Sequence, residues 1–290
     1  MLAYRGGHDT ENVRWSLRQL YPHFTGMVLE EMRGLDVRAY IQKREQDGVK
    51  PATINKEIGV LSAALNWARE ELEWDVPNPA KGRRLKEADG RLRWLSRAEA
   101  EALIRAAGDA RQAPHLVDFI RLGLNTGMRP GEMLALDWAR VDLPRGLIYL
   151  GKRNQKNRKV GSIPLNQEAR STLIQRARFR ATHCPASQWV FCDKEGNRIA
   201  SIRKGFGIAV RKAGLIDVHP HDLRRTCGSW LVQSGQSIHA VSDLLRHSDI
   251  RVTHEHYAHL APENLRDAVS VLDEYRSRFR HGNRSVTAEK

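Results

Sequence analysis

The sequence predicts a mainly α-helical protein with one small antiparallel β-sheet, built as two domains. Three observations predict this fold class. Apolar residues recur at helical spacing along most of the chain, residues 146–165 contain two strand-like segments, and a basic stretch with Pro and Gly follows a purely helical N-terminal part. With 290 residues and 41% hydrophobic composition, the chain can bury two cores of ordinary size.

The clearest N-terminal helix is expected to begin at Pro51, a residue that suits the first turn of a helix. Its apolar positions keep the helical period: Ile54, Ile58, Leu61, Leu65 and Ala68. The upstream segments ENVRWSLRQLY and LEEMRGLDVRAYIQKREQDG show the same pattern. Residues 1–88 are therefore expected to form a small helical domain.

The segment NPAKGRRLKEADGRLRWL is expected to connect the two domains. It mixes Pro and Gly with basic side chains, as an extended linker that follows phosphates would, although a merely soluble linker fits the composition equally well. The basic residues are Lys81, Arg83, Arg84, Lys86, Arg91 and Arg93.

A second domain is expected over residues 89–280, and residues 281–290 read as a flexible tail. It opens with Ser96 and Glu99, spaced as a capping box before a helix. LIYLG and KVGSIPL are expected to be strands joined by the basic turn KRNQKNR, and QWVFC a third strand. Helices return in HDLRRTCGSWLVQSG, IHAVSDLLRH and PENLRDAVSVLDEYRSRF.

The charge balance points to a polyanionic partner. Lys and Arg number 48 against 34 Asp and Glu, for a net charge of +14. Nucleic acid is favoured, because basic side chains that neutralise phosphates release counterions, while a solvated basic surface or weak affinity for a membrane surface is the alternative. The chain has neither a secretory signal nor a membrane-length apolar run, so we expect a cytoplasmic protein, in the bacterial cytoplasm or nucleoid, without a membrane partner.

Several familiar sites are disfavoured. Cys184, Cys192 and Cys227 form no CxxC pair, which argues against a disulfide framework or a zinc ribbon. GLIYLGK has phosphate-loop spacing but continues with Arg153 instead of Ser or Thr, and its centre reads as a strand. The histidines of the last third suggest a metal-dependent nuclease as an alternative, yet no HExxH motif or carboxylate cluster accompanies them. No metal and no cofactor are expected.

Two short motifs place cations at helix starts. Arg129 lies between Gly127, which can end one helix, and Pro130, which can begin the next; Glu132 could orient it, or could simply be a first-turn acid. An ordinary surface arginine fits this motif equally well. In HDLRR, the i, i+3 spacing brings His221 and Arg224 to one helix face, a pattern that also arises by chance.

Taken in chain order, Arg129, Lys156, His221, Arg224, His247 and Tyr257 supply the parts of a metal-free phosphoryl transfer: cations, proton donor, proton acceptor and nucleophile. NTGMRPGEML, HDLRRTCGSWLVQSG and LLRHSDIRVTHEHYAHL resemble the boxes of the tyrosine recombinases, the phage-integrase family. The resemblance spans almost the whole chain. It implies a helical core-binding (SAM-like) domain followed by an α+β catalytic domain.

The resemblance also implies the residue roles. Arg129 and Arg224 would clamp the scissile phosphate, with Glu132 in support, and Tyr257 would attack it. Lys156, eight residues before Pro164 as in the family's hairpin, would protonate the leaving oxygen. His221 and His247 would bond phosphate oxygens and help to remove the tyrosine proton. Two features depart from the family: His247 and Tyr257 lie ten residues apart instead of nine, with the extra residue expected in a loop, and Arg246 stands where Gly is common.

These expectations describe a recombinase that cleaves and rejoins double-stranded DNA through a 3′-phosphotyrosine and integrates or excises a phage or mobile element. The resemblance implies a homotetramer on DNA, and a monomer in free solution is compatible with it. A Xer-like resolvase and a type IB topoisomerase share the chemistry. A catalytically silent DNA-binding protein is the alternative from another class.

Overall fold

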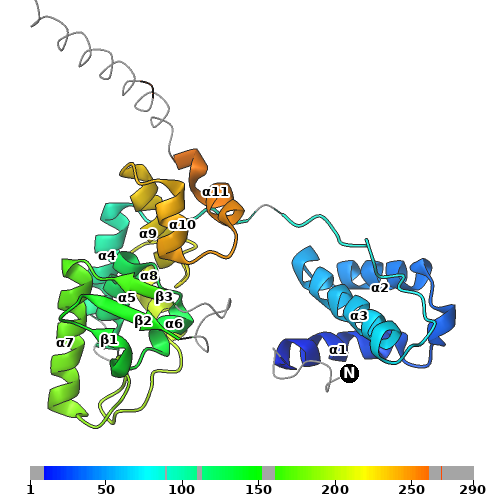
Figure 1. The fold of residues 1–290 in the computed structure, drawn as a ribbon, viewed down its shortest axis with the longest axis horizontal. Coiled ribbons are helices and arrows are strands. Elements are labelled where there is room, and N and C mark those ends of the chain that lie inside the picture. The colour runs from blue at the N-terminus through cyan, green and yellow to red at the C-terminus, as the bar shows by residue number, and fades with distance from the viewer. Residues whose placement is uncertain (1–9, 89, 110–112, 152–160, 261–268, 270–290) are drawn as a thin grey trace, which may run out of the picture. The chain divides into compact units, whose positions relative to one another are not determined.

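The computed structural model describes residues 10–88, 90–109, 113–151, 161–260 and 269. The chain divides into two compact units, Met1–Arg91 and Leu92–Lys290, drawn in Figure 1. Helices dominate both units, and one small antiparallel sheet accompanies them, which confirms the predicted fold class. None of the helices in the described ranges combines the length and the apolar character that a bilayer span requires.

The first unit is a helical bundle whose core lies between its longest helices. Its elements are α1 (Thr10–Phe24), the 3-10 turn η2 (Leu29–Glu31), α2 (Gly34–Gln46) and α3 (Pro51–Glu71). The five apolar residues that predicted α3 are all buried. The segment from Leu29 to Gln46, expected as one helix, is interrupted: Met32 and Arg33 are extended, and α2 begins only at Gly34.

The chain that leaves α3 packs back onto it. Val76 and Ala80 are buried in the core of the first unit. Asn55 of α3 exchanges two hydrogen bonds with the backbone of Leu85: its Nδ2 donates to the carbonyl at 2.9 Å, and its Oδ1 accepts from the amide at 2.8 Å. The first half of the basic segment is therefore fixed to the helical unit as far as Leu85.

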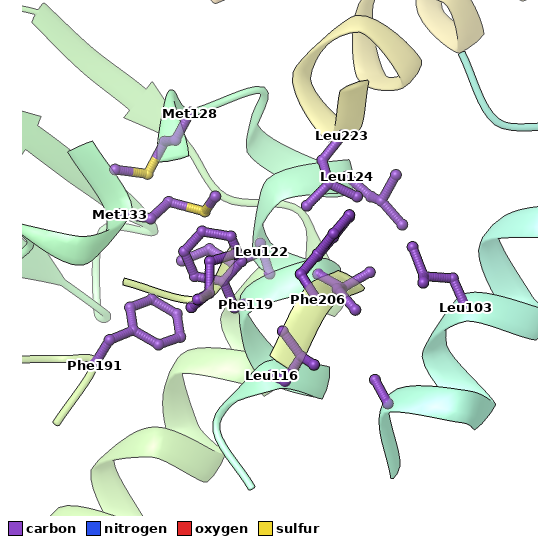
Figure 2. Close-up of a cluster of buried hydrophobic side chains, with 14 of the residues drawn as sticks. Leu103, Leu116, Phe119, Leu122, Leu124, Met128, Met133, Phe191, Phe206 and Leu223 are labelled. Atoms are coloured by element: carbon purple, nitrogen blue, oxygen red, sulfur yellow. The ribbon is translucent and has the colours of Figure 1, made fainter. Parts of the chain in front are cut away.

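The second unit is organised around α5, which contacts α4, α7 and α9. Its elements are α4 (Arg97–Gly108), α5 (Leu116–Thr126), α6 (Pro130–Leu134), η3 (Trp138–Arg140), α7 (Gln167–His183), α8 (Arg203–Lys212), α9 (Asp222–Gln233), α10 (Ile238–Leu245), α11 (Ile250–Tyr257) and η5 (Ala258–Leu260). Figure 2 shows Phe119, Leu122 and Leu124 of α5 meeting Phe206 of α8 and Leu223 of α9. The capping box is confirmed: Ser96 and Glu99 satisfy each other's backbone amides.

The sheet has the order β1 (Val141–Asp142), β2 (Leu147–Leu150) and β3 (Gly161–Pro164), all antiparallel. β2 and β3 are the two predicted strands, and Ile148 faces Ile163 across the ladder, both fully buried. The third strand was predicted wrongly. QWVFC forms only isolated bridges, Asp137 with Trp189 and Cys192 with Arg198, because its backbone pairs with loops instead of with β3. The third strand of the sheet is instead the short β1, which pairs with β2.

Candidate active site

The junction between α5 and α6 fixes the first predicted arginine. Gly127 ends α5 with a left-handed φ of 60°, and Pro130 begins α6, as the sequence predicts. Glu132 binds Arg129 twice: its Oε2 accepts from the Arg129 amide at 2.8 Å, and its Oε1 accepts from Nη1 at 2.7 Å. Only 3% of the Glu132 side chain is exposed, so this charge-assisted pair holds the guanidinium firmly.

The second predicted arginine connects three helices. Arg224, in the first turn of α9, is 2% exposed. Its Nη1 donates to the carbonyl of Gly127 at 2.7 Å, and its Nη2 donates to the carbonyl of Leu245 at the end of α10. Arg224 thereby satisfies carbonyls at the C-terminal ends of α5 and α10, where a cation is also favoured by the helix dipole.

Two guanidinium groups, those of Arg129 and Arg246, bind the Glu132 carboxylate, and the charge of Arg224 interacts with all three groups. Arg246 donates from Nη2 to Oε2 of Glu132 at 2.7 Å, and Nη2 of Arg129 lies 3.4 Å from the Arg246 carbonyl. Burial and, after it, the charges of Arg129 and Arg246 together lower the pKa of Arg224 to about 9. An arginine remains charged at neutral pH, so three positive charges face one negative charge, and the surplus favours an anion such as a phosphodiester.

The two predicted histidines lie beside this cluster and are neutral at physiological pH. Desolvation lowers the pKa of His221 to about 4, and the charge of Arg224 adds to the effect. The same causes, in the same order, lower the pKa of His247 to about 4. Nδ1 of His247 lies 2.7 Å from the hydroxyl of Thr253 on α11. A neutral imidazole can accept a proton, which a protonated one cannot.

Tyr257, at the end of α11, is 3% exposed and packs against α9 and α10. Its ring lies on Gly228 of α9, where an added Cβ would approach Cζ of Tyr257 to 2.6 Å. Burial raises the pKa of Tyr257 to about 12, and the charge of Arg224 opposes this shift. The phenol is therefore protonated at neutral pH, and its use as a nucleophile requires a proton acceptor.

The longer spacing between His247 and Tyr257 is accommodated differently from the expectation. The extra residue lies in THEHY, and from the sequence a loop is expected to absorb it. Instead, THEHY lies within α11, which continues without interruption from Ile250 to Tyr257. The Asp249 side chain accepts a hydrogen bond from the Arg251 amide and so caps this helix.

The remaining predicted residues are placed less directly. Lys156 falls between β2 and β3 in the sequence and lies outside the described residues. Arg93 forms an ion pair with Glu99 at 2.6 Å and so belongs to the start of α4. Arg84 forms an exposed ion pair with Glu87 at 3.3 Å, Nε of Arg83 donates to the Pro79 carbonyl, and Lys81 and Lys86 are exposed. Within the described ranges, no three His, Cys, Asp or Glu side chains are close enough to share a metal ion.

The site residue that sequence reasoning missed is Arg246. The sequence shows it only as an arginine in a position where the resembling family has glycine. A sharper signal was available, because an arginine directly before a candidate catalytic histidine adds positive charge at the place where phosphate would bind. The structure shows that its side chain contacts Glu132, 114 positions away in the chain.

The helical fold and this site define a tyrosine recombinase, an enzyme that cleaves and rejoins DNA. The chain belongs to the phage integrase family, whose model matches residues 93–264. It is 27% identical to the integrase of Salmonella phage P22, over 87% of this chain and 72% of that protein. It is 31% identical to tyrosine recombinase XerC of Pseudomonas aeruginosa strain LESB58, over 95% of this chain and 91% of that protein. It is therefore a site-specific recombinase.

Solved structures share the fold. The Tn1549 transposon integrase in complex with transposon right end DNA has a TM-score of 0.77 at 20% identity, over 94% of this chain and 96% of that one. A lambda integrase dimer bound to a COC′ core site has a TM-score of 0.71 at 19% identity, over 88% and 73%. At these identities the likeness concerns the fold alone.

Proposed function

We propose that this chain is the integrase of a phage or other mobile element and that it acts on duplex DNA through a 3′-phosphotyrosine at Tyr257. The observation that carries the proposal is the arginine cluster next to a buried tyrosine. Arg224 donates to the carbonyl of Gly127, two residues before Arg129, and the charges of the two arginines interact. The charge of Arg224 also acts on the phenol of Tyr257, where it opposes the rise in pKa that burial causes. A nucleophile and a surplus of positive charge at one point are what attack on a phosphodiester requires.

In the proposed reaction, Oη of Tyr257 attacks the scissile phosphorus and the bond from phosphorus to the 5′ oxygen breaks. The products are a 3′-phosphotyrosine and a free 5′ hydroxyl. Arg129 and Arg224 neutralise the non-bridging oxygens, whose negative charge grows during the attack. Rejoining reverses the step: a 5′ hydroxyl attacks the phosphotyrosine, and the tyrosine leaves. One phosphoester replaces another, so no nucleotide needs to be consumed.

Two protons move in each cleavage. The phenol proton passes to an imidazole, and the pKa values of about 4 mean that His221 and His247 are unprotonated, and so free to accept it, at neutral pH. The departing 5′ oxygen takes a proton from Lys156, a role that rests on the family resemblance. Glu132 acts through Arg129, which it binds at both the backbone and the side chain.

Duplex DNA is the proposed partner, and the protein would meet it at the chromosome. The support is the net charge of +14, together with the transposon right end DNA bound in the Tn1549 integrase structure and the COC′ core site bound in the lambda integrase structure. Exchange of both strands between two duplexes needs four active sites. We therefore propose a tetramer on paired DNA sites.

A Xer-like resolvase is the second candidate. The specific support is that a XerC protein is 31% identical over 95% of this chain, against 27% over 87% for the P22 integrase. The two functions differ in the arrangement of their sites. Recombination between a circular and a linear DNA would support the integrase, and reaction restricted to two identical sites on one circle would support the resolvase.

The direct test of the chemistry is covalent trapping. The protein is incubated in EDTA, without nucleotide, with nicked duplexes made from genomic fragments that it binds, and the products are separated in SDS. We expect a protein–DNA adduct for the wild type and for Tyr149→Phe, an exposed tyrosine on β2, and none for Tyr257→Phe. An adduct that persists in Tyr257→Phe, or that forms only when a divalent metal is added, would contradict the proposal.

A further inference from the structure

Arg246 has a backbone conformation that is costly for an arginine. Its φ of 55° and ψ of 48° are left-handed, and glycine adopts this conformation with far less strain. Among the described non-glycine residues, only Glu73 and Asp217 share a positive φ. Arg246 forms the C-cap of α10, directly before His247. A side chain kept at such a position in spite of its backbone cost points to a role for the guanidinium.

The Arg246 guanidinium is directed into the site and bound there. Its side chain is 9% exposed. Nη2 donates to Oε2 of Glu132 at 2.7 Å, and Nη1 donates to the Leu244 carbonyl at 2.8 Å. Nε is buried and has no hydrogen-bond partner in the part of the chain that the structure describes. The desolvation of this cation is thus offset mainly by the contact with Glu132.

We propose that Arg246 is a positioning residue that fixes Arg129 for the scissile phosphate by holding the Glu132 carboxylate between them. The inference rests on the proposed function. Each Glu132 oxygen accepts from one guanidinium, Oε1 from Arg129 and Oε2 from Arg246, so the carboxylate cannot turn without breaking one of these contacts. The Arg246 carbonyl also accepts a hydrogen bond from Nη2 of Arg129.

Of the two guanidinium groups that share Glu132, that of Arg129 is the more accessible: its side chain is 24% exposed, against 9% for Arg246. A phosphate would therefore reach Arg129, and Arg246 would act on Arg129 through Glu132. This predicts that the effect of Arg246 depends on the Glu132 charge, which a double-mutant cycle can measure.

The experiment measures single-turnover formation of the Tyr257 adduct on the duplex that traps the wild-type protein, with DNA affinity and thermal midpoint recorded for each variant. The variants are Arg246→Gly, Arg246→Lys, Glu132→Gln and the double variant Arg246→Gly/Glu132→Gln. Glycine suits the left-handed backbone, so the fold should survive. Glu73→Gly controls for the backbone change, and Arg251→Ala, an exposed charge on α11, controls for the loss of one cation.

We expect Arg246→Gly to slow adduct formation about 10- to 100-fold with DNA affinity nearly unchanged, and Arg246→Lys to recover part of the rate. The double variant should be no slower than Glu132→Gln alone. A wild-type rate in Arg246→Gly, or effects that multiply in the double variant, would overturn the inference while the proposed function stands. Absence of an adduct with the wild type would overturn both.

Discussion

Arg224 has two tasks that only a guanidinium can combine. It donates to the carbonyls of Gly127 and Leu245, and its positive charge adds to those of Arg129 and Arg246 nearby. Lysine offers a single point of charge and cannot span two carbonyls in a fixed plane. The identity of this side chain therefore matters for the chemistry and for the geometry of the helices that it connects.

We predict that Arg224→Lys lowers the rate of strand cleavage about 10²- to 10³-fold, the usual loss when one preorganised donor to a developing charge is removed. Duplex binding should change little, because many other cations contribute to it. The measurement is single-turnover cleavage with a parallel gel-shift titration. Arg105→Lys, in an exposed pair on α4, is the matched control. Equal loss of binding and of cleavage would argue against the assigned role.

The depressed histidine pKa values also predict how stability changes with pH. Burial and the charge of Arg224 lower the pKa of His247 to about 4 in the native protein, against the ordinary value of 6.5 expected in the unfolded chain. Between these values the unfolded chain binds more protons, so the free energy of unfolding should fall as the pH drops from about 6.5 to about 4.

For His247, the loss between pH 7 and pH 5 should be on the order of 1 kcal/mol, after allowance for its partial contact with solvent. Urea unfolding of the wild type and of His247→Gln at both pH values measures it. The glutamine variant should show a smaller loss. Identical pH dependence in the two proteins would mean that His247 does not titrate as the site geometry requires.

The packing of the Tyr257 ring against helix α9 depends on a glycine. Gly228 lies where α9 meets α11, and a Cβ there would lie 2.6 Å from Cζ of Tyr257 and 2.9 Å from Cδ1 of Leu245. Neither atom is the end of a flexible polar side chain. The close approach of α9 to the tyrosine ring is therefore possible only without a side chain at position 228.

We predict that Gly228→Ala destabilises the protein by about 1–3 kcal/mol, the usual cost of overpacking, and also reduces adduct formation because the ring is displaced. Gly207→Ala on α8 is the control, since its Cβ would meet only the end of Arg211 at 3.8 Å. That change should be neutral or slightly stabilising, because alanine is the better helix former. Thermal unfolding and trapping assays compare the two, and equal behaviour would refute the packing argument.

Local patterns predicted the elements that depend on local physics. The period of Ile54 to Ala68 gave α3, the Ser96 capping box gave the start of α4, and alternation gave β2 and β3. The two-residue strand β1 was missed because it is too short to show alternation. QWVFC was assigned wrongly because its buried apolar residues belong to a loop that packs on the core, a tertiary effect that sequence pattern does not contain.

The candidate site was predictable as a set of residues but not as an electrostatic unit. Sequence motifs named Arg129, Arg224 and Tyr257, and they offered Glu132 as a residue that could orient Arg129. That Arg246 shares the same carboxylate depends on a contact across 114 positions and on a left-handed residue at the end of α10. The contact has no local signature, and the sequence hints at the left-handed residue only because Arg246 stands where the family commonly has glycine.

The net charge of +14 on the whole protein predicts how its affinity for duplex DNA depends on salt concentration. Each phosphate contact releases counterions, so a protein that makes about six or more such contacts loses at least about 10³-fold in affinity between 50 and 200 mM salt. We predict a dependence of this size. Titration of a labelled duplex at several salt concentrations measures the slope, and a nearly flat slope would contradict duplex binding through the basic surface.

In the proposed reaction, Tyr257 becomes covalently joined to the 3′ phosphate of a cut DNA strand. Digestion of the trapped adduct with protease and nuclease, followed by mass spectrometry of the modified peptide, identifies the residue and the linkage. We expect a nucleotide on Tyr257, attached through its 3′ phosphate, and a free 5′ hydroxyl on the released strand. A nucleotide on another residue, or attachment through a 5′ phosphate, would contradict the proposed reaction.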